Sequence, residues 1–204
     1  MGHSETGERL PVSRYALFFL PATIALAVDL VTKSWVFHNY YDPLGAQPSW
    51  WIEGVLGIQT SLNPGALFGL GAGYSWLFAI FSVLAIVGIL VWLFCFQGFS
   101  DRWLTFALGL ITGGILGNLY DRCGLGFMEG VPAESWDNVR DWIHFRLEGV
   151  SMFDPWPNFN IADSALVCGA ILLFFHALFL QPQPAEETDS NTPQDSDEEA
   201  IRHV

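Results

Sequence analysis

The sequence predicts an all-α membrane protein, with four transmembrane helices and a small β element in the extracytoplasmic loops. Its composition is the first reason: 51% of the 204 residues are hydrophobic and 14% are charged, whereas a soluble domain carries about 25% charged residues. The second reason is a set of four apolar runs, each close to the roughly 20 residues that a bilayer-spanning helix needs. These runs cover residues 15–37, 76–96, 103–120 and 161–180. So many runs in so short a chain argue against the alternative, a soluble helical core.

The chain begins with a segment, residues 1–14, that we expect on the cytoplasmic side. Arg9 and Arg14 precede the first apolar run, and the loop after that run has no Lys or Arg, a bias that places the N-terminus in the cytoplasm. The arginines of the second outer loop weigh against this orientation. The first run is too long for the core of a cleavable signal peptide and carries Asp29 and Lys33. We therefore interpret it as a true span.

The loop that follows, residues 39–74, contains the pattern of a strand. Apolar and polar residues alternate from Leu56 to Leu62, which is the period of a half-buried strand, and Asn63-Pro64-Gly65 then indicates a turn. A second short extended piece is expected at residues 139–143, in the other outer loop. Together they predict a small β element on the outer membrane surface.

The second and third apolar runs are joined by a tight turn. Run 76–96 is the most apolar of the four, and run 103–120 contains Gly109, Gly113 and Gly117 at intervals of four. Small residues at this spacing allow helices to approach closely in lipid. The glycines therefore predict a helix-packing seam, which carries the end of the third span to a junction between helices.

The segment after the fourth run explains the net charge of −13. Residues 181–204 are rich in Pro, Gln, Ser, Thr and acidic groups, so we expect a disordered cytoplasmic tail. There is no basic patch for nucleic acid. The three cysteines lack metal-ligand spacing and no HExxH motif occurs, so neither a metal nor another cofactor is expected.

Polar residues that are costly at membrane depth gather at one face of the predicted bundle. Charged groups in membrane spans tend to mark functional sites. The cluster comprises Asp29, Lys33, Asn63, Asn118, Asp121, Asp141, Asn160 and Asp163.

Each member of this cluster also has a purely structural interpretation. Asp29 and Lys33, four residues apart on one helix, could form a neutralising pair. Asn160 could be a helix N-cap, with Asp163 in the first turn. These interpretations weaken when all of them must coincide on one membrane face.

Carboxylates are the plentiful catalytic groups of the cluster, since no Ser–His or Cys–His pair stands out. Two nearby carboxylates can share a proton, so that one member activates water and the other hydrogen-bonds the developing oxyanion. Spacing alone does not choose between Asp121 and Asp141 as the partner of Asp163. A carboxylate committed to an arginine is a poor proton sharer, which mildly favours Asp141.

Five sequence blocks resemble, in order, the signature blocks of the lipoprotein signal peptidase (signal peptidase II) family. The resemblance extends from about Asp29 to the end of the fourth span. The blocks are Asp29-Leu-Val-Thr32-Lys33, Asn63-Pro-Gly65-Ala-Leu-Phe68-Gly69, Gly113-Gly114-Ile-Leu-Gly117-Asn118-Leu-Tyr-Asp121-Arg122, Val139-Arg-Asp141-Trp-Ile143 and Phe159-Asn160-Ile-Ala162-Asp163-Ser164.

The resemblance implies an aspartic endopeptidase of the bacterial inner membrane, with its site at the extracytoplasmic face. Its substrates would be diacylglyceryl-modified prolipoproteins held partly in membrane lipid, and it would cut before the lipidated cysteine. Asp141 and Asp163 would be the catalytic pair, supported by Asp29 and Lys33. The remaining family positions would shape the pocket and hold the substrate: Asn63, Asn118, Asp121, Arg122, Asn160 and Ala162.

Two features depart from the family pattern. Residues 128–138 form an insertion in the second outer loop, and Trp142 stands where the family usually has Phe. The main alternative function is a small proton- or cation-coupled carrier, but its relay should continue toward the inner face, where the spans have few ionisable groups. A membrane adapter that presents the acidic tail would leave the outer carboxylates unexplained.

Overall fold

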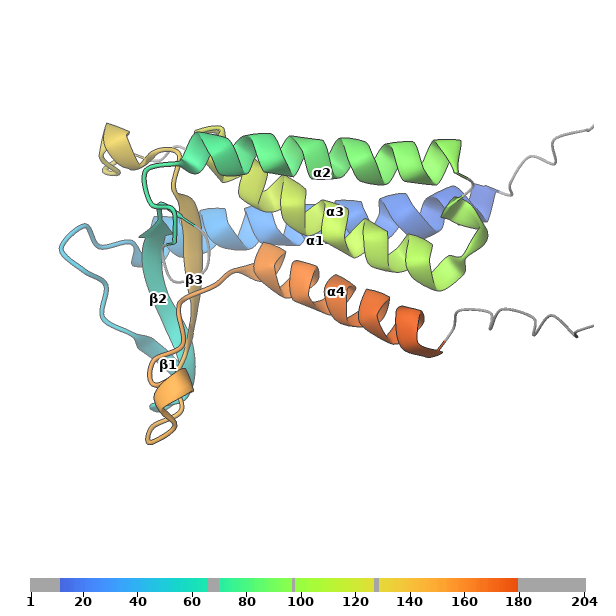
Figure 1. The fold of residues 1–204 in the computed structure, drawn as a ribbon. Coiled ribbons are helices and arrows are strands. Elements are labelled where there is room, and N and C mark those ends of the chain that lie inside the picture. The colour runs from blue at the N-terminus through green and yellow to red at the C-terminus, as the bar shows by residue number, and fades with distance from the viewer. Residues whose placement is uncertain (1–11, 66–69, 97, 127–128, 180–204) are drawn as a thin grey trace, which may run out of the picture.

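Four long helices form the body of the protein (Figure 1). The structure, a computed structural model, describes residues 12–65, 70–96, 98–126 and 129–179, so the predicted acidic tail lies outside the described residues. The helices are α1 (Val12–Tyr40), α2 (Ser75–Cys95), α3 (Arg102–Arg122) and α4 (Ile161–Phe179). All four are long and apolar enough to cross a membrane. The predicted class, four spanning helices with a small sheet, is confirmed.

Helix α3 is the centre of the bundle, and α2 and α4 lie on opposite sides of it (Figure 1). Glycines allow its close packing. A Cβ atom at Gly113 would lie 2.5 Å from the Ala22 carbonyl oxygen of α1, and one at Gly114 would lie 2.5 Å from the Ala162 carbonyl oxygen of α4. The predicted seam therefore faces α1. The neighbouring Gly114 allows the same close approach to α4.

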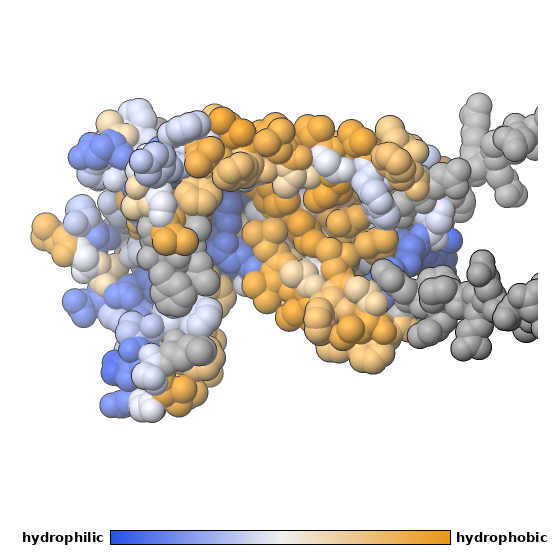
Figure 2. Space-filling model, viewed as in Figure 1, coloured by the Kyte–Doolittle hydropathy of each residue, from blue (hydrophilic) through white to orange (hydrophobic). Residues whose placement is uncertain are grey.

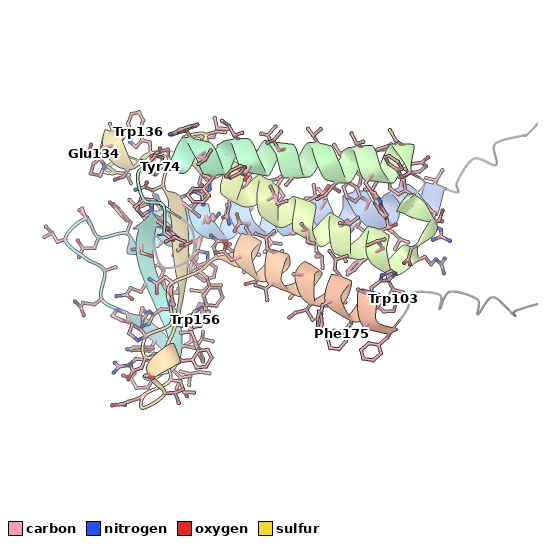
Figure 3. All side chains as sticks on the ribbon, viewed as in Figure 1. Tyr74, Trp103, Glu134, Trp136, Trp156 and Phe175 are labelled. Atoms are coloured by element: carbon pink, nitrogen blue, oxygen red, sulfur yellow. The ribbon has the colours of Figure 1, made fainter. Side chains whose placement is uncertain are left out.

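The outside of the bundle is apolar over most of its length (Figure 2). In α2, Ser75 and Leu93 are the buried residues, while most of its large apolar side chains are exposed. Aromatic side chains mark both ends of the bundle, with Tyr74 and Trp136 toward the sheet and Trp103 and Phe175 toward the other end (Figure 3). Aromatic rings prefer the membrane–water interface. This surface is that of a multi-pass membrane protein.

A three-stranded antiparallel sheet lies across the end of the bundle where α1 ends and α4 begins, in the order β1-β2-β3 (Figure 1). The strands are β1 (Ser49–Ile52), β2 (Leu56–Asn63) and β3 (Val139–Phe145). The β2–β3 pairing sets Ser61 opposite Asp141 and Asn63 opposite Val139. Strand β1 was not predicted, because four residues without alternation carry no periodic signal; it forms by hairpin pairing to β2.

Apolar packing fixes the sheet to the helices. The C-terminal end of α1 supplies Val36 and Phe37, which are buried against Ile58 of β2 and against Trp142 and Ile143 of β3. The predicted 128–138 insertion is described from residue 129 onward. It includes the short 3-10 turn Ala133–Ser135, and it is tied to the start of α2 by the Ser75 hydroxyl, which donates to the Asp137 carbonyl oxygen.

Candidate active site

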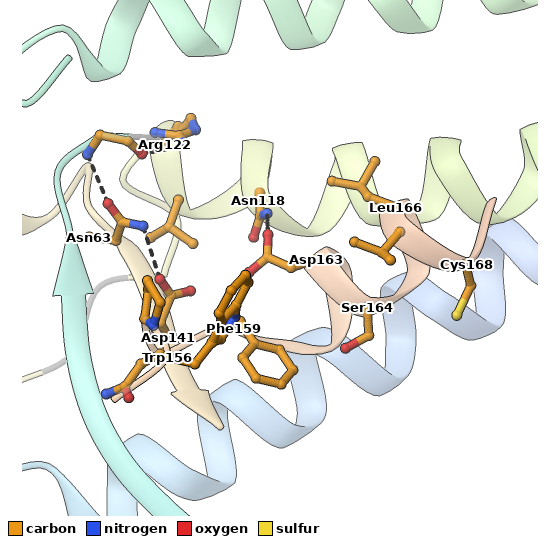
Figure 4. A pocket seen from close by; sticks show the side chains of 15 residues that line it. Asn63, Asn118, Arg122, Asp141, Trp156, Phe159, Asp163, Ser164, Leu166 and Cys168 are labelled. Atoms are coloured by element: carbon orange, nitrogen blue, oxygen red, sulfur yellow. Dashed lines mark hydrogen bonds between the residues drawn. The ribbon is translucent and has the colours of Figure 1, made fainter. Parts of the chain in front are cut away.

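Polar side chains from four elements meet where the sheet crosses the bundle (Figure 4). They line a cavity of about 570 Å³. Strand β2 contributes Asn63, α3 contributes Asn118 and Arg122, β3 contributes Asp141, and α4 contributes Asp163. The cavity continues along α4 past apolar side chains. It therefore has a polar end at the sheet and an apolar part beside a membrane-spanning helix.

The two carboxylates of the cavity are held by amide donors. Asp141 accepts hydrogen bonds from Asn63 Nδ2 (3.0 Å) and Asn160 Nδ2 (2.6 Å). Asp163 accepts from Asn118 Nδ2 (2.8 Å) and from the backbone N–H of Asn160 (3.1 Å). Each of the four carboxylate oxygens therefore accepts one N–H, and Asn160 bonds both groups.

Asn160 and Asp163 also form the reciprocal cap of α4. The Asn160 side-chain oxygen accepts from the Asp163 backbone N–H at 2.9 Å, while the Asp163 carboxylate accepts from the Asn160 backbone N–H. This is the geometry of a capping box, with Asp in place of Glu. The structural interpretation of these residues is thus correct, and the same cap orients Asp163 toward the cavity that it lines.

The environment of Asp141 favours its protonated form. The residue is 2% exposed, and its burial, followed by the negative charge of Asp163, raises the pKa of Asp141 to about 8. The amide groups of Asn63 and Asn160 and the charge of Lys33 oppose this shift. At neutral pH the pair can therefore hold a proton on Asp141.

Asp121 lies behind the cavity rather than on its wall. It is 1% exposed and accepts from Arg140, with Arg140 Nη2 at 2.7 Å and Nε at 2.9 Å, and it forms an ion pair with Lys33 at 3.0 Å. Because successive side chains of a strand alternate in direction, Arg140 turns to Asp121 while Asp141 turns to the cavity. The arginine partner that mildly disfavoured Asp121 as a proton sharer is therefore Arg140.

Lys33 connects this ion pair to the cavity. It is fully buried, with its Nζ 2.7 Å from Asp29 and 2.9 Å from Asn118 Oδ1. Because the Asn118 oxygen accepts from Lys33, its Nδ2 group faces Asp163. Lys33 thus fixes which end of the Asn118 amide reaches the cavity.

The residues expected from the sequence therefore divide into two layers. The pair Asp141 and Asp163 lines the cavity together with Asn63, Asn118 and Arg122. The second layer supports this wall from behind: Asp29, Lys33, Asp121, Asn160 and Ala162. Ala162 is fully buried, and its backbone N–H donates to Asp29 Oδ1 at 2.9 Å.

The sequence analysis missed one wall of the cavity, residues 156–159, which precede α4. Asn158 anchors this segment: its Nδ2 donates to the Gln59 carbonyl oxygen (2.8 Å), and its Oδ1 lies 2.8 Å from His144 Nδ1. Because the amide nitrogen is used as a donor, His144 must supply the proton of the second bond. No sequence spacing indicates this pair; proximity to the Phe159-Asn160 block is the sole hint.

Comparison with known proteins identifies the family. A family model described as signal peptidase (SPase) II matches residues 21–179. The chain belongs to the signal peptidase II family. A lipoprotein signal peptidase of Rhodopirellula baltica is 48% identical over 198 residues, covering 93% of this chain and 87% of that protein. One of Rhodococcus jostii is 35% identical over 162 residues, covering 78% of this chain and 71% of that protein.

Solved structures agree with the fold of this family member. Two bacterial membrane enzymes each align with a TM-score of 0.62, at 24% and 25% sequence identity. The alignments cover 82% and 79% of this chain and 93% and 92% of the other chains. Family membership supports the removal of lipoprotein signal peptides as the activity of this signal peptidase.

Proposed function

We propose that the protein is an intramembrane aspartic endopeptidase, which removes the signal peptide from diacylglyceryl-modified prolipoproteins by cutting before the lipidated cysteine. The observation that carries this proposal is the pair of Asp141 and Asp163. Both face one cavity, both are bound by Asn160, and the pKa of Asp141 is raised so that the pair can hold one proton. The family supplies the substrate class.

In the proposed reaction a water molecule lies between the two carboxyl groups. The water oxygen attacks the scissile carbonyl carbon while Asp163 accepts a proton from the water. Protonated Asp141 donates a hydrogen bond to the carbonyl oxygen as that oxygen becomes negative. The tetrahedral intermediate then breaks its C–N bond. The proton taken up by Asp163 passes to the leaving nitrogen, so the pair returns to its starting state.

Arg122 is the candidate donor to the substrate backbone. Its Nη2 donates to the Gly65 carbonyl oxygen at 3.0 Å, while Nη1 is buried without a hydrogen-bond partner among the described residues. A buried donor left unpaired costs free energy. A peptide carbonyl in the cavity would satisfy it and orient the chain for attack.

We further propose that the active unit spans residues 15–180 of an inner-membrane protein, with the site at the extracytoplasmic face. Residues 1–14 and the acidic tail 181–204 would lie in the cytoplasm. The signal peptide would enter from the bilayer along the apolar part of the cavity beside α4, where Leu166, Val167 and Cys168 form the wall. No metal takes part in this mechanism.

The deciding experiment incubates purified protein with a lipidated precursor and with its unlipidated form, followed by mass analysis of the products. We expect a cut before the lipidated cysteine, faster for the lipidated form because its lipid holds the scissile bond at the right depth. Activity should persist with chelator present, and Asp163→Asn protein is the control. If neither precursor is cleaved, the proposal is refuted.

A further inference from the structure

A second hollow lies on the other side of α4 from the cavity, between α1, α3 and α4. Its volume is about 470 Å³. Pro21, Ala25 and Ala165 are small or compact and mostly buried at its base, whereas Ile24 and Val28 are half exposed at its rim. The groove exists because these small side chains leave space between α1 and α4, which both pack against α3 and have few contacts with each other.

This groove adjoins the active-site cavity. Ser164 and Cys168 line both hollows, and they stand one turn apart on the exposed side of α4 (Figure 4). Both side chains are short, so they form a low ridge between the two spaces. Ser164 directly follows Asp163, and one end of the groove therefore lies within about 5 Å of Asp163 along the helix axis.

The shape and chemistry of the groove fit one unbranched hydrocarbon chain. It extends along α1 from Leu20 to Val28, a rise of about 12 Å, which is less than half of the roughly 30 Å hydrocarbon core. Its side chains are apolar apart from Ser164, whose hydroxyl already donates to the Asn160 carbonyl oxygen, so the groove offers no partner for a polar headgroup. An acyl chain can fill it by dispersion contacts.

We infer that the groove binds one acyl chain of the lipidated substrate, while the polypeptide occupies the cavity on the other side of α4. This inference rests on the proposed function. Free phospholipid chains surround the helices, and in a bilayer the transfer of a chain into the groove gains little hydrophobic free energy. The substrate chain has the advantage of attachment: once the cysteine lies at the carboxylate pair, its chain is held at high effective concentration beside the groove.

The test uses the full-length protein in nanodiscs and a cleavable lipidated precursor with a photoactivatable diazirine in one acyl chain. A phospholipid with the same labelled chain, at equal mole fraction, measures the occupancy by bulk lipid. The groove variants are Val28→Trp and Ile24→Trp, at positions 43% and 53% exposed, where a larger side chain can fill the groove without entering a core. The matched control is Val31→Trp, on the same helix, 66% exposed and outside the groove.

We expect the precursor to label residues 20–28 of α1 more strongly than the phospholipid does. Val28→Trp and Ile24→Trp should reduce that labelling and raise KM for the lipidated precursor by roughly three- to tenfold, the loss expected for one tethered contact, with kcat little changed. Val31→Trp should match the wild type, and cleavage of unlipidated precursor should be unaffected throughout.

Equal labelling of α1 by phospholipid and precursor would overturn the inference, because bulk lipid would then fill the groove. So would equal KM values for the three tryptophan variants. If the wild type cleaves the precursor but labelling is confined to other helices, binding of the acyl chain in the groove is refuted and the proposed function stands. Absence of cleavage by the wild type would refute both.

Discussion

At the scale of single residues, the site separates carboxylates by their partners. Asp121 forms ion pairs with Arg140 and Lys33. Asp141 and Asp163 instead accept hydrogen bonds from amide groups, and the charge of Asp163 acts on Asp141. A carboxylate between two cations serves as a structural counter-charge. A carboxylate among amides, beside a second carboxylate, can gain and lose a proton. This difference decides which substitutions should affect chemistry and which should affect stability.

Asp141→Asn and Asp163→Asn should each lower kcat by a factor on the order of 10⁴, because an amide cannot cycle a proton. The double variant should be little slower than either single variant, since the two residues act as one unit. Precursor-cleavage time courses at matched amounts of folded protein provide the measurement. Independent, multiplying losses would show that the two carboxylates do not share a role.

Asp121→Asn should instead destabilise the fold, because it leaves Arg140 without its buried counter-charge, whereas Lys33 keeps Asp29. Removal of one partner from a buried ion pair costs about 3–5 kcal/mol. Thermal unfolding in detergent should show a clear fall in Tm for Asp121→Asn and a small change for Asp163→Asn. If Asp121→Asn unfolds like the wild type but is inactive, Asp121 belongs to the catalytic unit.

The rate of cleavage should fall at alkaline pH. Because the pKa of Asp141 is raised to about 8, its proton is retained through neutral pH and lost above that value. The protonated form is the one required, so kcat should decline roughly tenfold per pH unit above this pKa. A pH–rate profile on the lipidated precursor tests this. A rate that keeps rising through pH 9 would assign the proton elsewhere.

At the scale of elements, close helix packing and one loop anchor position the site. The seam between α1 and α3 brings Asp29 and Lys33 beside Gly117, where a Cβ atom would collide with the Asp29 carboxylate. The loop before α4 is held by the His144–Asn158 pair. Both arrangements hold residues of the cavity wall in place.

Gly113→Ala should separate α1 from α3, because the added Cβ meets backbone atoms of Ala22 that cannot move aside. Overpacking of this kind costs about 1–3 kcal/mol. Gly88→Ala in α2 is the matched control, since no atom lies within 4 Å of its Cβ position, and it should be neutral or slightly stabilising. Tm values of the two variants decide; a loss confined to Gly88→Ala would contradict the packing argument.

His144→Phe should loosen the loop before α4 by removing the donor to Asn158. The loss of one such bond, with a partner left unsatisfied, costs about 1–3 kcal/mol. Combined with Asn158→Leu, a double-mutant cycle in unfolding free energy should give a coupling of about 1 kcal/mol. Additive effects would mean that the two side chains act separately.

At the scale of the whole molecule, the sheet lies at one end of an apolar bundle and the turn between α2 and α3 lies at the other. The carboxylate pair lies at the sheet end, on β3 and at the start of α4. The turn between α2 and α3 is held by Arg14, which donates to the Ser100 carbonyl oxygen at 2.7 Å, and by the 2.5 Å contact of His176 with Asp101. Arginine at the start of α1 favours the cytoplasm for that end.

The orientation can be checked with two native cysteines. Cys123 follows α3 at the sheet end of the bundle and Cys95 ends α2 at the opposite end, and both are exposed. In spheroplasts a membrane-impermeant maleimide should label a single-cysteine variant that retains Cys123. The variant that retains Cys95 should react after the membrane is opened. The opposite pattern would invert the topology.

The sequence by itself determined the four helices, the second and third strands and the set of polar residues at one end of the bundle. These features follow from local physics: the length of apolar runs, strand periodicity and the cost of charge in lipid. Family resemblance then named the two aspartates, which spacing did not choose.

The tertiary structure alone decided how these residues are partnered. The assignment of Asp121 to Arg140, the orientation of Asn118 by Lys33, and the wall built on His144 and Asn158 all join residues from different elements. Such contacts depend on sheet register and helix packing, which leave no periodic trace in a single chain. Strand β1 and the groove beside α4 were hidden for the same reason, since each exists through a neighbour that the local sequence does not specify.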